Sequence, residues 1–143
     1  MERIVIIGRP KSGKTDFALA LLNRIVAQGN GVEWFSESSI REQVNDWDYA
    51  SEGHVRIATA ADLSMAQSSA DFILCDIVAP NDKCREILRP DYLIWLDTNA
   101  VRHITDRTDF DPVNSCYLRL TDRNFDRWAT AIAKWVTSKR KRA

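Results

Sequence analysis

The sequence predicts one α/β domain, a three-layer sandwich in which helices cover both faces of a parallel five-stranded sheet. Short apolar runs, many of them β-branched, alternate along the chain with longer segments whose apolar residues recur at helical spacing. Such alternation is typical of parallel strands joined by crossover helices. The chain has 143 residues, of which 45% are hydrophobic and 28% charged, so it is long enough to bury one core.

The predicted strands are short and apolar, as expected for strands that are buried on both faces. We expect them at residues 3–7, 32–35, 71–76, 92–96 and 116–120. The third strand ends in Asp76, and Asp97 directly follows the fourth. No internal repeat or interdomain linker interrupts the pattern, which favours a single domain over residues 1–143.

The predicted helices are identified by apolar spacing and by residues that favour helix ends. We expect them from residue 15 to Gly29, around 40–44, at 52–67, at 80–88, and from about 122 to the C-terminal region. Ser38 or Ser39 would cap the second helix. Thr121 or Asp122 would cap the last. Core packing is the expected role of the tryptophans in patterned segments, which are Trp34, Trp95, Trp128 and Trp135.

The stretch between the first strand and the first helix carries the most specific motif. It reads Gly8-Arg9-Pro10-Lys11-Ser12-Gly13-Lys14-Thr15 and fits the phosphate-binding loop (P-loop) pattern of Gly, four residues and Gly-Lys-Thr. In such a loop the backbone N–H groups and the following helix dipole bind phosphates. Lys14 would reach the β- and γ-phosphates of ATP, and Thr15 would offer its hydroxyl to Mg²⁺. The strand before it and the helix after it argue against a chance match, because a phosphate-binding loop lies between a strand and a helix.

Acidic residues at the ends of other strands extend this site, because ligands bind beyond the carboxyl ends of parallel strands. Asp76 is the predicted carboxylate behind Mg²⁺. The alternative for Asp76 is an acid that only caps the loop after its strand. Glu37, which follows the second strand, would face the acceptor hydroxyl, or else it is an exposed loop residue. For Asp97 and Thr98 we expect local hydrogen bonds.

Basic residues supply the remaining predicted site groups. Arg41, in the helix after the second strand, would bind an anionic acceptor. Residues 98–115 form a long polar segment without apolar periodicity, which is typical of a lid-like loop. In it, Arg102 and Arg107 would close over the phosphates and stabilise the transferring charge. The alternative is a loop in which these arginines pair with neighbouring acids.

Composition limits the partners of the chain. Twenty basic and twenty acidic residues cancel, so no overall field attracts nucleic acid or an anionic membrane. The basic tail at 139–143 is expected to be solvated. Three cysteines without C-x-x-C spacing suggest neither disulfides nor zinc. With no signal segment and no long apolar run, the expected compartment is the cytoplasm. His54 and His103 are expected at the surface or partly packed, without a catalytic role.

Several stretches resemble the adenylylsulfate kinase family, and more closely its short, phage-encoded members. They are residues 8–15, Trp34-Phe35 followed by Ile40-Arg41, residues 45–53, residues 71–80, and residues 90–98 followed by the loop from 102 to 112. The resemblance implies a P-loop NTPase fold of the nucleotide-kinase-like type, with ATP, Mg²⁺ and a host cytoplasm. It also implies an acid after the second strand that serves the acceptor hydroxyl, and a substrate-binding arginine three residues later.

This chain departs from the family pattern on the acceptor side. Arg41 matches the substrate-binding arginine, but Ser38 takes the place of the acid, with Glu37 one residue away. Among the polar positions that follow in the phage-type relatives, Arg56 is kept as an acceptor-binding residue. The others are replaced by apolar residues or histidine, namely His54, Ile57 and Ala60.

Three functions follow from these observations. The first is an ATP-dependent kinase that phosphorylates a hydroxyl of a small nucleotide-like acceptor, such as adenylyl sulfate. The second is a catalytically degenerate nucleotide-binding protein that acts through a partner. The third is a kinase of nucleic-acid 5′-hydroxyls, although the neutral net charge argues against tight binding to long duplexes.

Overall fold

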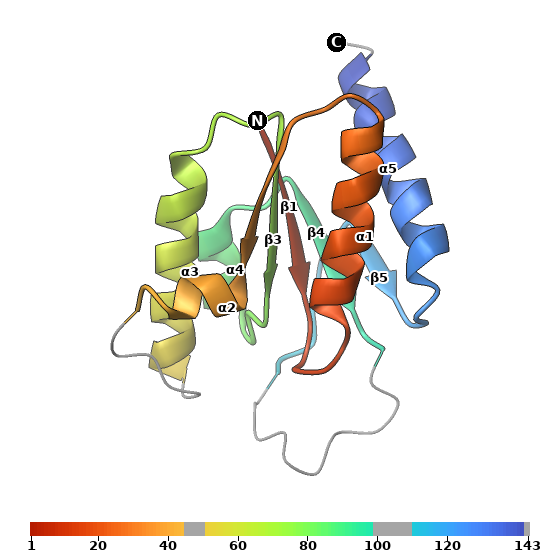
Figure 1. Cartoon of the computed structure of the whole chain (residues 1–143). Coiled ribbons are helices and arrows are strands. Elements are labelled where there is room, and N and C mark those ends of the chain that lie inside the picture. The colour runs from red at the N-terminus through yellow and green to blue at the C-terminus, as the bar shows by residue number, and fades with distance from the viewer. Residues whose placement is uncertain (45–50, 99–109, 142–143) are drawn as a thin grey trace.

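The structure is a computed structural model that describes residues 1–44, 51–98 and 110–141 (Figure 1). Within them, the strands are β1 (Glu2–Ile7), β2 (Val32–Ser36), β3 (Phe72–Ile77), β4 (Tyr92–Leu96) and β5 (Leu118–Leu120). They form one sheet in the order β2-β3-β1-β4-β5, and every neighbouring pair is parallel. The predicted fold class is therefore confirmed. We call the side of the sheet at which the parallel strands begin its amino edge, and the side at which they end its carboxyl edge.

Helices cover both faces of the sheet. They are α1 (Lys14–Ala27), α2 (Glu37–Arg41), α3 (Ser51–Ala66), α4 (Asp82–Leu88) and α5 (Phe125–Lys141). Helices α1 and α5 pack together on one face, while α3 and α4 lie on the other (Figure 1). None of the helices in the described part of the chain combines the length and the apolar character needed to cross a membrane.

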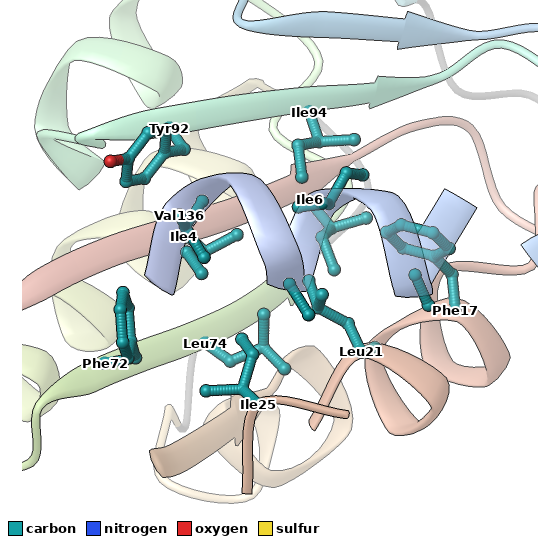
Figure 2. Close-up of a cluster of buried hydrophobic side chains, with 14 of the residues drawn as sticks. Ile4, Ile6, Phe17, Leu21, Ile25, Phe72, Leu74, Tyr92, Ile94 and Val136 are labelled. Atoms are coloured by element: carbon teal, nitrogen blue, oxygen red, sulfur yellow. The ribbon is translucent and has the colours of Figure 1, made fainter. Parts of the chain in front are cut away.

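One core lies between the sheet and the pair α1 and α5 (Figure 2). Ile4 and Ile6 of β1 meet Leu21 and Ile25 of α1 there, and Val136 of α5 closes the cluster. The residues between them in β1, such as Val5, point to the other face, where they pack with side chains of α3 and α4. Both faces are buried, which explains why the strands read as unbroken apolar runs.

Two helix starts differ from the prediction. Helix α2 begins at Glu37, and its cap is Ser36, whose Oγ accepts a hydrogen bond from the Ser39 N–H at 3.4 Å. The predicted caps Ser38 and Ser39 are wrong because the chain turns into the helix directly from β2. Helix α5 begins at Phe125, three residues after Asp122. Asp122 instead accepts hydrogen bonds from the Asn124 N–H and the indole of Trp128.

Two burial predictions are also wrong. Trp135 is 45% exposed on α5 rather than packed in the core. His54, expected at the surface or only partly packed, is 4% exposed within α3. Trp135 lies beside, rather than on, the face of α5 that buries Ile132 and Val136, whereas His54 lies one turn before Ile57 and Ala58 on the buried face of α3. Trp34, Trp95 and Trp128 are partly buried against the two cores, as predicted.

Candidate functional site

The phosphate loop joins β1 to α1 at the carboxyl edge, and its glycines are required by space and by conformation. A Cβ on Gly8 would lie 2.7 Å from the carbonyl oxygen of Leu96. Gly13 has a φ of +96°, and a Cβ on it would lie 2.7 Å from the ring of Phe125. Lys11 also has a positive φ, of 66°. The loop thus adopts a compact turn that side chains at the two glycines would obstruct.

Two side chains from distant parts of the sequence hold this loop. Thr98, just after β4, donates a hydrogen bond from Oγ1 to the Ser12 carbonyl at 2.6 Å. Arg123, just before α5, donates from Nη2 to the Lys11 carbonyl at 2.6 Å. Neither role was predicted from the sequence, and for Thr98 a local hydrogen bond was expected instead. No local pattern signals contacts between segments 86 and 112 residues apart.

Lys14 lies inside the loop, as the motif requires. Lys14 is 9% exposed, and its Nζ donates a hydrogen bond to the Arg9 carbonyl at 2.9 Å. The hydroxyl of Ser12 is fully buried in the same loop and finds no hydrogen-bond partner among the described residues. A buried donor of this kind is costly unless a ligand or water satisfies it. The loop therefore presents both a cation and an unused polar group next to its backbone.

Asp76 and Thr15, the predicted magnesium ligands, are brought together. Asp76 is 2% exposed, and its Oδ2 accepts a hydrogen bond from Thr15 Oγ1 at 3.1 Å. Its Oδ1 accepts one from Trp34 Nε1 at 2.6 Å. Burial raises the pKa of Asp76 above the ordinary value, although these bonds and the charge of Lys14 act in the opposite direction. Asp76 lies within β3, so it is not merely a cap of the following loop.

The oxygen atoms of Thr15 and Asp76 are suitable ligands for Mg²⁺. A hydroxyl and a carboxylate offer oxygen atoms, which are the ligands that this hard cation prefers. Among the residues that the structure describes, no group of three or more His, Cys, Asp or Glu side chains gathers to form a full metal cage. Mg²⁺ in phosphoryl-transfer sites is held by one or two protein groups, and substrate phosphates and water complete its shell.

Glu37 and Arg41 form a second pair at the carboxyl edge, and both members of this pair are charged. Glu37 is 8% exposed, so it is not a solvated loop residue. Its Oε2 accepts a hydrogen bond from Arg41 Nη2 at 2.6 Å, and its Oε1 accepts one from the Val78 N–H at 3.1 Å. These bonds from α2 and from the end of β3 fix the carboxylate in one orientation.

One cavity of about 330 Å³ brings the two pairs together, and we call it the phosphate-loop cavity. Its lining residues come from the loop, the start of α1, α2 and the end of β3, and they are Pro10, Lys11, Gly13, Lys14, Thr15, Asp16, Glu37, Ser38, Arg41, Asp76 and Val78. Parallel strands therefore deliver segments far apart in the sequence to one concave site, as the sequence analysis predicted.

Other predicted site residues lie elsewhere. Arg56 is exposed and lines a second cavity of about 600 Å³ together with Asn81 and Asp111. Arg102 and Arg107 lie outside the described residues. Asp97, for which local hydrogen bonds were expected, pairs instead with a residue 22 positions away, since its Oδ2 accepts hydrogen bonds from Arg119 Nε at 3.1 Å and Nη2 at 2.5 Å.

The positions that depart from the family pattern in α3 do not open toward the phosphate-loop cavity. Ile57 is fully buried in the core beneath α3, and His54 is buried as well. Ala60 packs against the same core. These three residues are absent from the lining of the phosphate-loop cavity.

Arg85 is a further residue that the sequence analysis missed. It is 5% exposed, and burial lowers the pKa of its guanidinium. It donates hydrogen bonds to the Ala79 carbonyl at 2.9 Å and to the Asp111 carbonyl at 2.7 Å. Its guanidinium also lies 4.8 Å from the centre of the Phe110 ring. Arg85 thereby ties residues 110 and 111 to the end of β3.

Comparison with known proteins supports the fold. No protein-family model matches the sequence, and no curated protein matches it. The APS kinase of Mycobacterium tuberculosis, in complex with AMPPNP and APS, superposes with a TM-score of 0.80 at 14% identity, covering 95% of this chain and 97% of that one. A gluconokinase from Sinorhizobium meliloti gives 0.65 at 15% identity, with 96% and 94% covered. Shikimate kinase from Acinetobacter baumannii gives 0.59 at 14%, with 97% and 94% covered. The chain thus has the fold of P-loop kinases over nearly its whole length.

Proposed function

We propose that this protein is an ATP-dependent kinase that transfers the γ-phosphoryl group to a hydroxyl of a small, nucleotide-like acceptor. The observation that carries the proposal is the phosphate-loop cavity, which joins the pair Thr15 and Asp76 to the pair Glu37 and Arg41. The first pair suits a magnesium nucleotide, and the second suits a hydroxyl that must lose a proton. The fold shared with APS, sugar and shikimate kinases supports the same reaction class.

On the nucleotide side, the loop of residues 8–15 would bind the phosphates. Lys14 would exchange its bond to the Arg9 carbonyl for the β- and γ-phosphates. Thr15 and Asp76 would hold Mg²⁺, which offsets phosphate charge when it is bound. Thr98 and Arg123 keep the loop in place from outside.

On the acceptor side, Glu37 would take the proton of the acceptor hydroxyl. As that oxygen forms its bond to the γ-phosphorus, the bond from this phosphorus to the bridging oxygen of ADP breaks. Each oxygen of Glu37 accepts one bond in the structure and retains a second lone pair for a proton. Arg41 would orient Glu37 and attract an anionic group of the acceptor.

Adenylyl sulfate is the acceptor to test first. One structural neighbour is an APS kinase in complex with APS, and the sequence resemblance points the same way. Arg56 and the second cavity would bind the remainder of such an acceptor. Residues 98–115 would form the lid, with Arg102 and Arg107 over the phosphates. The contacts of Arg85 with Phe110 and Asp111 would hold these two residues of the lid segment in place.

A nucleotide-binding protein without transfer activity is the second candidate. Ser38 stands where the resemblance expects the acid, and Ile57 is buried where a polar acceptor-binding residue is expected. Such a protein would bind ATP at the same loop and act through a partner.

A phosphate-transfer assay separates the two candidates. Wild type, Glu37→Gln and the control Glu42→Gln, which changes an exposed glutamate just past α2, are incubated with γ-labelled ATP, Mg²⁺ and adenylyl sulfate or other hydroxyl acceptors. We expect labelled product with wild type and the control, and a loss of about 100-fold or more in Glu37→Gln. ATP binding without transfer to any acceptor would favour the second candidate.

A further inference from the structure

We propose that Trp34 is a positioning residue for the magnesium carboxylate. Its indole N–H holds one oxygen of Asp76 and thereby directs the other oxygen toward Thr15 and the cation. This inference rests on the proposed nucleotide site. Neither the sequence motif nor the fold assigns Trp34 a part in it, since core packing alone explains a tryptophan in a strand.

The pairing of β2 with β3 brings the two side chains together. Trp34 lies opposite Leu74, and Ser36 lies opposite Asp76, so Trp34 and Asp76 are diagonal neighbours. Because side chains alternate along a strand, residues two positions apart share a face. Trp34 and Leu74 both pack with the core under α1 and α5, so Asp76 faces the start of α1. An indole is long enough to span such a diagonal.

The contacts of Asp76 divide its two oxygens between two elements. Oδ1 accepts the hydrogen bond from Trp34 Nε1 at 2.6 Å, and Oδ2 accepts that from Thr15 Oγ1 at 3.1 Å. Asp76 is 2% exposed, so bulk water does not replace either donor. The last side-chain torsion of an aspartate has broad energy minima, so without the indole the carboxylate of Asp76 could rotate. The indole N–H therefore decides which oxygen stays beside the hydroxyl.

The chemistry of the indole suits this role. It is a donor only, so it neither competes for the cation nor accepts a proton from Asp76. Its ring also fills the edge of the core, where it is partly buried. Residues that orient a metal ligand through a hydrogen bond commonly change metal affinity about 10–100-fold when they are replaced.

The test compares two changes of the same chemistry. Trp34→Phe keeps an aromatic ring and removes the N–H. Trp128→Phe does the same in α5, where Trp128 Nε1 donates to Asp122 Oδ1 at 3.0 Å, away from the phosphate-loop cavity. ATP affinity is measured by calorimetry in EDTA and over a Mg²⁺ series, and thermal unfolding checks the fold of each variant.

We expect Trp34→Phe to bind ATP in EDTA as wild type does and to need about tenfold more Mg²⁺ for the same gain in affinity. Trp128→Phe should match wild type in both conditions. An unchanged Mg²⁺ requirement in folded Trp34→Phe would overturn the inference and leave the proposed function standing. Failure of wild type to bind ATP would overturn both.

A measurement on the wild type covers the case in which Trp34→Phe does not fold. In ¹⁵N-labelled protein saturated with a non-hydrolysable ATP analogue, the indole N–H signal of Trp34 is followed during addition of Mg²⁺. We expect this signal to shift as the cation binds, and that of Trp128 to stay in place. Equal or absent shifts for the two indoles would overturn the inference.

Discussion

The pKa of an aspartate is shifted in opposite directions at the two edges of the sheet, where Asp62 is partly buried and Asp76 is buried. At the amino edge, Asp62 of α3 accepts hydrogen bonds from Arg3 Nη1 at 2.6 Å and Arg89 Nη2 at 2.9 Å. Burial acts to raise the pKa of Asp62, but the bonds and charges of these arginines outweigh it, and the pKa is lowered. At the carboxyl edge, burial prevails and the pKa of Asp76 is raised.

This difference separates a stabilising group from a functional one. The ionised form of Asp62 is favoured by folding, so its charge contributes to stability. The two donors to Asp76 are neutral groups, a hydroxyl and an indole. A carboxylate held in this way costs stability until a cation arrives, which is the property expected of a metal ligand. Four variants test the contrast, from the largest expected effect to the smallest.

Breaking the amino-edge cluster should cost most. The side chains of Arg3 and Asp62 are only 11% and 19% exposed, so Asp62→Ala leaves a buried guanidinium without its counter-charge. We expect a loss of about 2–3 kcal/mol in the free energy of unfolding, measured by urea denaturation. ATP affinity should not change. The control Asp126→Ala removes a salt bridge whose acid is 87% exposed and should stay near wild type.

The pH dependence of this effect follows from the lowered pKa of Asp62. Its contribution is present above the unfolded value of 3.8 and is lost as pH falls through the lower folded value. The stability difference between wild type and Asp62→Ala should therefore be full at neutral pH and shrink below about pH 4. A difference that grows toward acid pH would contradict this assignment.

Gly13→Ala, a change at the carboxyl edge, should have the second-largest effect on stability. The added Cβ meets the Phe125 ring at 2.7 Å, and the φ of +96° is unfavourable for alanine. We expect a loss of about 1–3 kcal/mol in stability, because the ring must shift. Unlike Asp62→Ala, this variant should also lose ATP binding, measured by calorimetry. Gly29→Ala is the control for the backbone cost, since it also has a positive φ, of +87°, but nothing lies within 4 Å of its Cβ.

Asp76→Asn should stabilise the fold while it impairs the site. A group whose folded pKa is raised favours folding only below its unfolded value, here 3.8, and loses this contribution as pH rises through the folded value. Removing the charge should therefore raise Tm by about 2–4 °C at pH 7, with a smaller gain below pH 4. The Mg²⁺ dependence of ATP binding should disappear. A lower Tm at neutral pH would contradict the contrast between the two edges.

Asp97→Asn should have the smallest effect. Asp97 lies at the carboxyl edge too, but its pair with Arg119 is solvated, with side chains 35% and 55% exposed. Exposed ion pairs contribute little, so we expect a change below about 0.5 kcal/mol in urea denaturation. ATP affinity should also stay unchanged. A loss as large as that of Asp62→Ala would mean that charge pairing, rather than burial, determines how much an ion pair stabilises this fold.

The sequence was sufficient where a signal is local or periodic. The bounds of β4 were predicted at residues 92–96, and the P-loop and Asp76 were placed correctly at one edge, because strand alternation and parallel order determine that placement. Contacts across long separations were not predictable. The bond from Trp34 to Asp76 spans 42 residues, and that from Arg123 to Lys11 spans 112. Helix α2 was placed too late because a short helix has no full apolar period to fix its start.

Calorimetric titration of ATP with Mg²⁺ into wild type and Lys14→Ala tests the central claim most directly, that the phosphate-loop cavity binds a magnesium nucleotide. We expect one-site binding to wild type that weakens when EDTA replaces Mg²⁺. Lys14→Ala, with an unfolding temperature close to that of wild type, should bind at least about 100-fold more weakly, because a charge-assisted contact to the phosphates is lost. Equal binding by the two proteins, or none by wild type, would contradict the claim.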